Sequence, residues 1–363
     1  MTTPKLNMTS FTRYLSLVLL MMLYVNSFMD RQNIAVLGES IRLDLGLSFT
    51  DLGWLYGPSF SWIYAIMGLV MGRLADKTSR VRIILIGATV WSFATLASGW
   101  ASSLGFLIAM RMALGLSQAA LSPAVYSLLA DVFPQERRAT VFSAYASAIF
   151  IGVGLSFLVG GSVAQAYDWR ISLQLLGASG FLLVGLSIVG LIEPSRISYQ
   201  GSGEDSIKQG NSADSFVSEK SVWNQLRGLL SKPALRYHLL GFGLLAMSGY
   251  TILAFIGSIF TQSFDRVDLI PSYGWFLVAT TVAVNGAGWI SDRWAKHYGP
   301  RNRLAWGWIS RLVSLPFLWV GLHSEHPMLA FWAIGIGNII ASSYNGVAAA
   351  TIQFFARDDQ RGL

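Results

Sequence analysis

The sequence contains no cysteine among its 363 residues. This absence excludes a disulfide framework, a thiolate nucleophile and a thiolate metal site. Charged residues make up only 12% of the chain, whereas a soluble globular chain carries about 25%. Histidine occurs four times, and His323 and His326 lack the helical spacing of a zinc site, so we expect no metal.

Motifs for catalysis are also lacking. The chain has no Gly-x-Ser-x-Gly elbow, no His-Glu-x-x-His, no phosphate-binding loop and no complete Gly-x-Gly-x-x-Gly. We therefore expect no enzyme activity, no cofactor and no drive by ATP. A gradient would have to supply energy, and a membrane potential provides about 2.3 kcal/mol per charge per 100 mV.

Long hydrophobic runs dominate the chain instead. Hydrophobic residues make up 53% of the sequence, the mean hydropathy is +0.51, and aromatic residues reach 13%, as expected of belts at both membrane interfaces. About 20 apolar residues form one spanning helix, and ten segments qualify: 14–38, 51–75, 82–101, 104–131, 139–166, 170–192, 234–262, 272–294, 301–321 and 327–355. The sequence predicts an all-α membrane protein in a lipid bilayer.

The distribution of Lys and Arg predicts the orientation of these spans. If both termini are cytoplasmic, 20 of the 26 basic residues fall on the cytoplasmic side. Three lie on the other side, namely Arg42, Arg170 and Arg266. The remaining three, Arg31, Arg111 and Arg311, lie inside spans. The net charge of +7 therefore indicates membrane topology rather than a nucleic-acid partner.

One connection is much longer than the others. It runs from Glu193 to Pro233 and is rich in Ser, Gly, Gln and charge, a composition typical of a flexible linker. We predict an N-terminal half of six helices over residues 1–192, a cytoplasmic linker over 193–233, and a C-terminal half of four helices over 234–363.

A short internal repeat relates the two halves. The string Gly72-Arg-Leu-Ala-Asp76 returns 216 residues later as Gly288-Trp-Ile-Ser-Asp292. Both strings follow the second helix of their half on the cytoplasmic side, which indicates parallel halves. We expect these loops to form a cytoplasmic gate, with the residues Gly72, Asp76, Arg80, Arg82, Gly288, Asp292 and Arg293.

These strings carry a resemblance. The first loop resembles the signature Gly-x-Leu-Ala-Asp-Arg-x-Gly-Arg-Arg of the major facilitator superfamily, with Ser79 in place of the second Gly. Arg111-Met-Ala-Leu-Gly115 resembles that superfamily's Arg-x-x-x-Gly element. Two further strings resemble bacterial spinster-type transporters, with the related anion:cation symporters as the alternative: Phe28-Met-Asp30-Arg31-Gln-Asn33-Ile and Ser127-Leu-Leu-Ala-Asp131-Val-Phe-Pro134-Gln-Glu-Arg137.

The resemblance implies a monomeric major facilitator fold, in which the first, fourth, seventh and tenth helices line a central cavity. Ten of the usual twelve helices are expected here. The chain stops at Leu363, just where an eleventh helix would begin, so we interpret it as a truncated gene product or fragment. Gln118 is a further departure, because spinster-like transporters often place a Glu at this position.

Ionisable residues inside spans predict a solute or proton site, because charge at bilayer depth is costly. Asn26, Asp30 and Asn33 share one face of the first helix. Asp30 and Arg111 lie at matched depth, so an ion pair between them is feasible and leaves Arg31 to attract an anion. The pair could be a proton switch or a static contact that fixes helix packing. Gln118 and Ser122 continue this predicted site on the fourth helix.

The second half contributes neutral groups, namely Tyr250, Asn285, Asn338, Ser342 and Asn345. They could line a cavity for an amphiphilic or anionic solute, or they could bind helices to one another. Three interpretations of Arg311 remain open. It could bond to carbonyls freed by Pro316, extend its charged end to the membrane surface, or belong to the site.

We therefore interpret the chain as a secondary active transporter of the bacterial inner membrane. It would move a small organic, anionic or amphiphilic solute by alternating access, with proton coupling and through symport or uniport. The alternative is a non-transporting membrane sensor or an inactive truncated paralogue.

Overall fold

The computed structural model describes residues 9–194, 231, 233–299, 305–345 and 347. Every regular element in these residues is a helix. Most of the predicted linker, and the chain beyond residue 347, lie outside the described residues.

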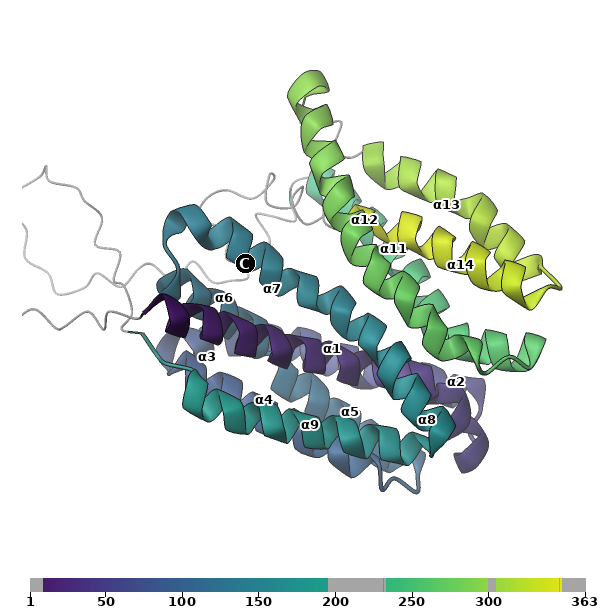
Figure 1. Cartoon of the computed structure of the whole chain (residues 1–363), viewed down its shortest axis with the longest axis horizontal. Coiled ribbons are helices and arrows are strands. Elements are labelled where there is room, and N and C mark those ends of the chain that lie inside the picture. Colours follow the sequence, from purple (N-terminus) through teal and green to yellow (C-terminus); the bar gives the residue numbers. More distant parts are fainter. Residues whose placement is uncertain (1–8, 195–230, 232, 300–304, 346, 348–363) are drawn as a thin grey trace, which may run out of the picture.

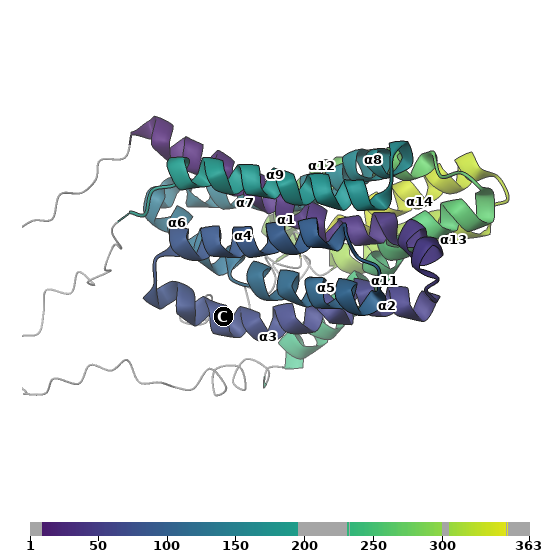
Figure 2. The same ribbon diagram turned by 90° about the horizontal axis from the view of Figure 1, so that it is seen from below.

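The helices form two groups (Figures 1 and 2). The N-terminal group comprises α1 (Ser10–Leu45), α2 (Phe49–Tyr56), α3 (Pro58–Lys77), α4 (Arg80–Ser98), α5 (Leu104–Gln118), α6 (Leu121–Val132), α7 (Gln135–Leu155), the π-helix η1 (Ser156–Gly161), α8 (Ser162–Ala166) and α9 (Trp169–Gly190). The C-terminal group comprises α11 (Pro233–Ser258), the π-helix η2 (Ile259–Ser263), α12 (Leu269–Tyr298), α13 (Ala305–His323) and α14 (Pro327–Ser342).

Helix α1 extends past both ends of the apolar run that predicts it. The Thr9 side chain accepts a hydrogen bond from the N–H of Thr12 and caps the start of the helix. At the other end Gly46 adopts the left-handed conformation, with φ 63°, and its N–H bonds to the carbonyl of Arg42. The helix therefore extends beyond the predicted span, 14–38, because capping and not hydrophobicity determines where it stops.

Two of the predicted spans are each broken into two helices. In the segment 51–75 the break is at Gly57, before Pro58, because a proline disfavours helical geometry in the residue before it. In the segment 104–131 the break lies at Ala119 and Ala120. Pro123 follows and has no N–H to bond the carbonyl four residues earlier.

The outer surface is that of a membrane protein. Six helices or helix runs among the described residues are long and apolar enough to cross a bilayer: Ser10–Leu45, Arg80–Ser98, Leu104–Val132, Thr140–Ala166, Trp169–Gly190 and Leu235–Ser263. Large apolar side chains remain exposed, including Trp62, Trp275, Trp308, Trp319 and Trp332. The exposure of so many large apolar side chains fits contact with lipid.

Within the N-terminal group, α9 packs against both α1 and α4 (Figure 2). Trp91 of α4 is fully buried there, and its indole N–H donates to the side-chain oxygen of Asn26, at 3.2 Å. Polar links of this kind hold helices together in lipid, where apolar burial alone gives little preference for one helix neighbour over another.

The two groups meet at the end of the bundle where α1 finishes. Helix α12 contacts α7 and η1, and α11 contacts α1. A Cβ added at Gly274 would lie 2.5 Å from the carbonyl oxygen of Gly154, so only glycine allows this approach of α12 to α7. Towards the opposite end α7 and α12 diverge (Figure 1).

We expect Gly274→Val to weaken this contact. The added side chain would have to push the two backbones apart, and overpacking costs about 1–3 kcal/mol. The apparent melting temperature in detergent should fall by roughly 2–6 °C. Gly286→Val is the matched control, because a Cβ at Gly286, on the same helix, meets no atom within 4 Å among the described residues. Equal melting of the two variants would contradict the packing argument.

Candidate functional site

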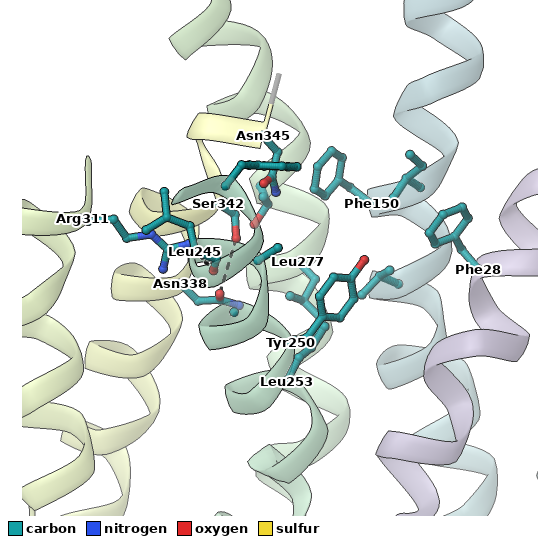
Figure 3. Close-up of a pocket in the computed structure, with 16 residues that line it drawn as sticks. Phe28, Phe150, Leu245, Tyr250, Leu253, Leu277, Arg311, Asn338, Ser342 and Asn345 are labelled. Atoms are coloured by element: carbon teal, nitrogen blue, oxygen red, sulfur yellow. Dashed lines mark hydrogen bonds between the residues drawn. The ribbon is translucent and has the colours of Figure 1, made fainter. Parts of the chain in front are cut away.

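A pocket of about 320 Å³ lies between the two groups of helices. Phe28 of α1 and residues of α7, including Phe150, face it from one side, and the C-terminal group forms the other side (Figure 3). Its lining residues are Phe28, Ile149, Phe150, Val153, Phe242, Leu245, Ala246, Gly249, Tyr250, Leu253, Leu277, Thr280, Arg311, Asn338, Ser342 and Asn345. The volume falls in the range of small-molecule sites, which are mostly apolar with a few polar groups.

Four of the neutral residues predicted for the site line this pocket, namely Tyr250, Asn338, Ser342 and Asn345. The Ser342 hydroxyl lies 3.4 Å from the side-chain oxygen of Asn338 and donates to it (Figure 3). Asn285 does not line the pocket. It is exposed, and its amide bonds to the carbonyl of Thr281 in its own helix, at 2.7 Å.

The polar stripe of α1 faces the interior of the N-terminal group and not the pocket. The Asn26 amide donates to the hydroxyl of Ser179, at 3.2 Å, and the Asn33 amide donates to that of Ser172, at 3.4 Å, both on α9. The spacing correctly places these side chains on one face. The spacing does not show which neighbouring helix that face contacts. In the structure both residues link α1 to α9.

The expected ion pair between Asp30 and Arg111 is absent from the described residues. Arg111 is buried and donates to three backbone carbonyls instead, those of Asp30, Arg31 and Leu55, each at 3.3 Å. Both carboxylate oxygens of Asp30 are buried, and neither has a hydrogen-bond partner among the described residues. Matched depth therefore brings the two residues together, but through the backbone of Asp30.

Arg31 is held by its own surroundings. Its Nε donates to the side-chain oxygen of Gln118, at 2.7 Å. The guanidinium also lies over the rings of Phe28, Phe60 and Tyr64, at 4.5–5.0 Å from their centroids. Arg31 therefore has a neutral acceptor in Gln118, at the position where the resemblance to spinster-like transporters leads us to expect a Glu.

The hydroxyl of Ser122 lies 3.5 Å from that of Tyr24 and donates to it. This contact links α6 to α1 inside the N-terminal group. Like Gln118, Ser122 is not among the pocket-lining residues.

A buried carboxylate that the sequence analysis missed links the two groups of helices. Glu39 of α1 accepts hydrogen bonds from Ser258, at 3.1 Å, and from Gln262, at 3.0 Å, in the C-terminal group. It also forms a bidentate pair with Arg42. Glu39 lies beyond the apolar run of the first span, and its burial depends on the approach of α11, which no local pattern reveals.

The gate residue Arg80 is almost fully buried, and its partners lie in the N-terminal group and in the segment that directly follows α9. Its guanidinium forms ion pairs with Asp131 and Glu193 and donates to the carbonyl of Ser127, at 3.1 Å. The second carboxylate oxygen of Glu193 accepts bonds from the Ser79 hydroxyl and the Val81 N–H. These contacts join the start of α4 and the end of α6 to the segment after α9.

No contact from Arg80 crosses to the C-terminal group in the part of the chain that is described. Of the other gate residues, Arg82 and Arg293 are exposed and Gly288 borders open space. The side chains of Asp76 and Asp292, and the surroundings of Gly72, lie outside the described residues. The predicted latch between the halves therefore remains a prediction.

Glu193 provides a test of the Arg80 cluster through pH. Burial acts to raise the pKa of Glu193, but hydrogen bonds from Val81, Ser79 and Arg80 outweigh it and hold the pKa below its ordinary 4.5. A lowered folded-state pKa contributes stability that is present above 4.5 and is lost as the pH falls through the folded-state value.

We expect Glu193→Gln to lower thermal stability at pH 7, by about 1–3 kcal/mol, because glutamine cannot pair with Arg80 as a charge. The difference from the wild type should shrink below about pH 4.5. Melting curves across pH would measure it, with the exposed Glu325→Gln as the control. A difference that does not change with pH would contradict the role of the ionised carboxylate.

Known proteins resemble the chain over stretches that range from less than half of it to nearly its whole length. The sequence profile of the Major Facilitator Superfamily matches residues 20–363. An MFS-type efflux pump of Mycolicibacterium smegmatis is 27% identical over 92% of this chain and 75% of its own length. The D-galactonate transporter of Escherichia coli is 32% identical over 40% of this chain and 33% of its own. Protein spinster of Drosophila melanogaster is 29% identical over 48% of this chain and 29% of its own.

Solved structures share the fold. A bacterial homologue of the human lysosomal transporter spinster, in an inward-facing and unoccupied conformation, has a TM-score of 0.81 at 20% identity, over 98% of this chain and 78% of that one. The nucleoside transporter NupG has a TM-score of 0.70 at 12% identity, over 96% of this chain and 84% of that one. The predicted resemblance to spinster-type transporters, with anion symporters as close relatives, is confirmed. The chain belongs to the Major Facilitator Superfamily, a family of membrane transporters and not of enzymes.

Proposed function

We propose that the chain moves a small organic anion across the bacterial inner membrane by alternating access, as a proton-coupled secondary transporter. The pocket between the two groups of helices carries this proposal. The groups touch at the end where α1 finishes and diverge at the other (Figure 1), which is the geometry of a site open to one side of the membrane.

The direction of that opening follows from the charge distribution. The excess of Lys and Arg places the start of α1 in the cytoplasm, so the closed end, with Glu39, faces outward and the pocket opens inward. The names of two relatives, an efflux pump and a D-galactonate transporter, support a solute carrier, and the second supports an organic anion. Because this chain spans only part of those proteins, their activities reach it only as a proposal.

Uptake into proteoliposomes tests the function directly. We expect an organic anion from a panel of D-galactonate, D-glucarate and 4-phenylbutyrate to enter faster than into empty liposomes, and D-galactose not to. Absence of flux for every anion, in either direction and with or without a pH gradient, would favour the alternative of a non-transporting sensor.

Glu39 supports an outer gate in this cycle. Opening the outer end must break its bonds to Ser258 and Gln262, which are the side-chain hydrogen bonds from α1 to the C-terminal group among the described residues. Bonds to a charged group contribute about 1.5–3 kcal/mol each in favourable cases. A conformational equilibrium that depends on them is therefore sensitive to one substitution.

We expect Glu39→Ala to shift the population towards the outward-open conformation by roughly 5- to 30-fold, or about 1–2 kcal/mol. Because the chain has no cysteine, cysteines introduced at exposed Leu43 and Val267 would carry spin labels at these two positions alone. The distances between the two labels should increase in Glu39→Ala. Asp51→Asn is the control, since Asp51 bonds only locally to Ser48 in this structure. Unchanged distances in Glu39→Ala would contradict the gate.

Asp30 is the residue that we propose for proton coupling. A buried ionised carboxylate without a well-formed ion pair or hydrogen bond costs several kcal/mol. Asp30 is buried beside Thr95, and Arg111 bonds to its backbone rather than to its carboxylate among the described residues. A conformation that lets water or a cation reach Asp30 would change its protonation. Because α1 also contacts α11 of the C-terminal group, we expect the movement between the two groups to provide such a conformation.

We expect Asp30→Asn to abolish uptake driven by a pH gradient and to preserve solute exchange in part, because asparagine has a similar shape and cannot titrate. Counterflow and gradient-driven uptake in vesicles would measure the two activities. Asp44→Asn is the matched control on the same helix, because Asp44 is exposed and pairs with Arg170, at 2.7 Å. Normal gradient-driven uptake by Asp30→Asn would contradict the proton role.

A further inference from the structure

Arg311 is a cation inside the bilayer-spanning region for which the described residues provide no ion-pair partner. It lies six residues into α13, roughly 9 Å from Ala305 along the helix axis. One Nη donates to the hydroxyl of Ser248, at 3.1 Å, and the other to the carbonyl of Leu245, at 2.8 Å. Its Nε is buried and has no acceptor among the described residues.

Neither structural reading of this residue from the sequence matches these contacts. The carbonyl that Pro316 frees belongs to residue 312 of the same helix, but Arg311 bonds to α11. A snorkelling side chain would extend towards the membrane surface, but Arg311 turns across to the neighbouring helix. Figure 3 shows it reaching from α13 towards Asn338 and Ser342 at the pocket.

The other two arginines at bilayer depth are bonded inside the N-terminal group, away from the pocket. Arg111 donates to three carbonyls with all three of its nitrogens. Arg31 binds Gln118 and is covered by three aromatic rings. Neither lines the pocket. The positive charge that lines this pocket is therefore on the C-terminal wall, on Arg311, and not on α1 or α5 as the sequence suggests.

The rest of the pocket limits what such an anion can be. Beside Arg311 stand the neutral groups of Tyr250, Asn338, Ser342 and Asn345, and most other lining side chains are aliphatic or aromatic. A solute with one anionic group and an apolar body would leave no charge without a partner. A dicarboxylate would bury a second charge against apolar walls, at a substantial cost.

We propose that Arg311 is the residue that binds the solute's anionic group and that the pocket selects an apolar monoanion. The inference rests on the proposed function, because it names the solute class for the same pocket. The inference can be tested separately from the proposed function, since binding of the anion does not depend on transport or on protons.

Binding of 4-phenylbutyrate and of its neutral isostere 4-phenylbutyramide to the purified chain tests the proposal. We expect the wild type to bind the anion at least about tenfold more tightly than the amide. Arg311→Gln should weaken anion binding by roughly 10- to 100-fold and leave amide binding unchanged, which also shows that the pocket is intact. Arg311→Lys should lose less, because it keeps the charge but not the fork of donors.

Arg266→Gln is the control, because Arg266 is exposed and pairs with Asp268 outside the pocket, at 2.7 Å. A measurement on the wild type avoids any folding defect in the variants: 4-phenylbutyrate should protect Arg311 from modification by phenylglyoxal and leave Arg266 unprotected. Failure of the wild type to bind the anion, loss of no affinity in Arg311→Gln, or absence of protection at Arg311 would each overturn the proposal. Anion binding without flux would instead contradict the proposed function and support the site.

Discussion

The arrangement of this chain depends on how each buried cation is compensated. A buried guanidinium requires acceptors or counter-charges, because water is not available to solvate it. Arg80 finds two carboxylates at the edge of the N-terminal group, and Arg111 finds three carbonyls where α1, α2 and α5 meet. These contacts fix the helices of the N-terminal group relative to one another.

The same requirement separates structural from functional charge. A cation that is fully bonded within one group of helices can hold that group rigid, but it has little left for a solute. A cation at the boundary between groups, with an unused donor, behaves differently. Arg311 has this position. The carboxylate of Glu39 also lies between the groups, at the closed end, but both of its oxygens are bonded there. Groups that are bonded internally, with few polar contacts between them, are what a rocking motion needs.

Much of the fold could be predicted from the sequence because the bilayer imposes strong constraints. Hydrophobic length predicted an all-helical membrane protein, and six helices or helix runs among the described residues are long and apolar enough to cross a bilayer. The repeat of Gly72 at Gly288 predicts two parallel halves. The helix breaks at Gly57 and near Pro123 were harder to predict from the sequence, since the apolar runs continue through them. Local backbone chemistry determines these breaks, and hydropathy averaged over about 20 residues does not resolve it.

The candidate site was harder to predict for a geometric reason. Periodicity shows which residues share a helix face, as it did for Asn26 and Asn33, but α1 has neighbours on several sides. Only the packed structure shows that this face meets α9. Asn338 and Ser342 were predicted to share a face of their helix, and in the structure that face of α14 lines the pocket.

Arg311 illustrates the limit most clearly. In the sequence its nearest polar neighbours are on its own helix, where Pro316 offers a plausible structural partner. In the structure its bonds go to Leu245 and Ser248, more than 60 positions earlier in the chain. Whether a buried cation is satisfied depends on a complete account of its neighbours in space. For this reason the strongest indication of a solute site comes from the donor that remains unbonded once α11, α13 and α14 have packed.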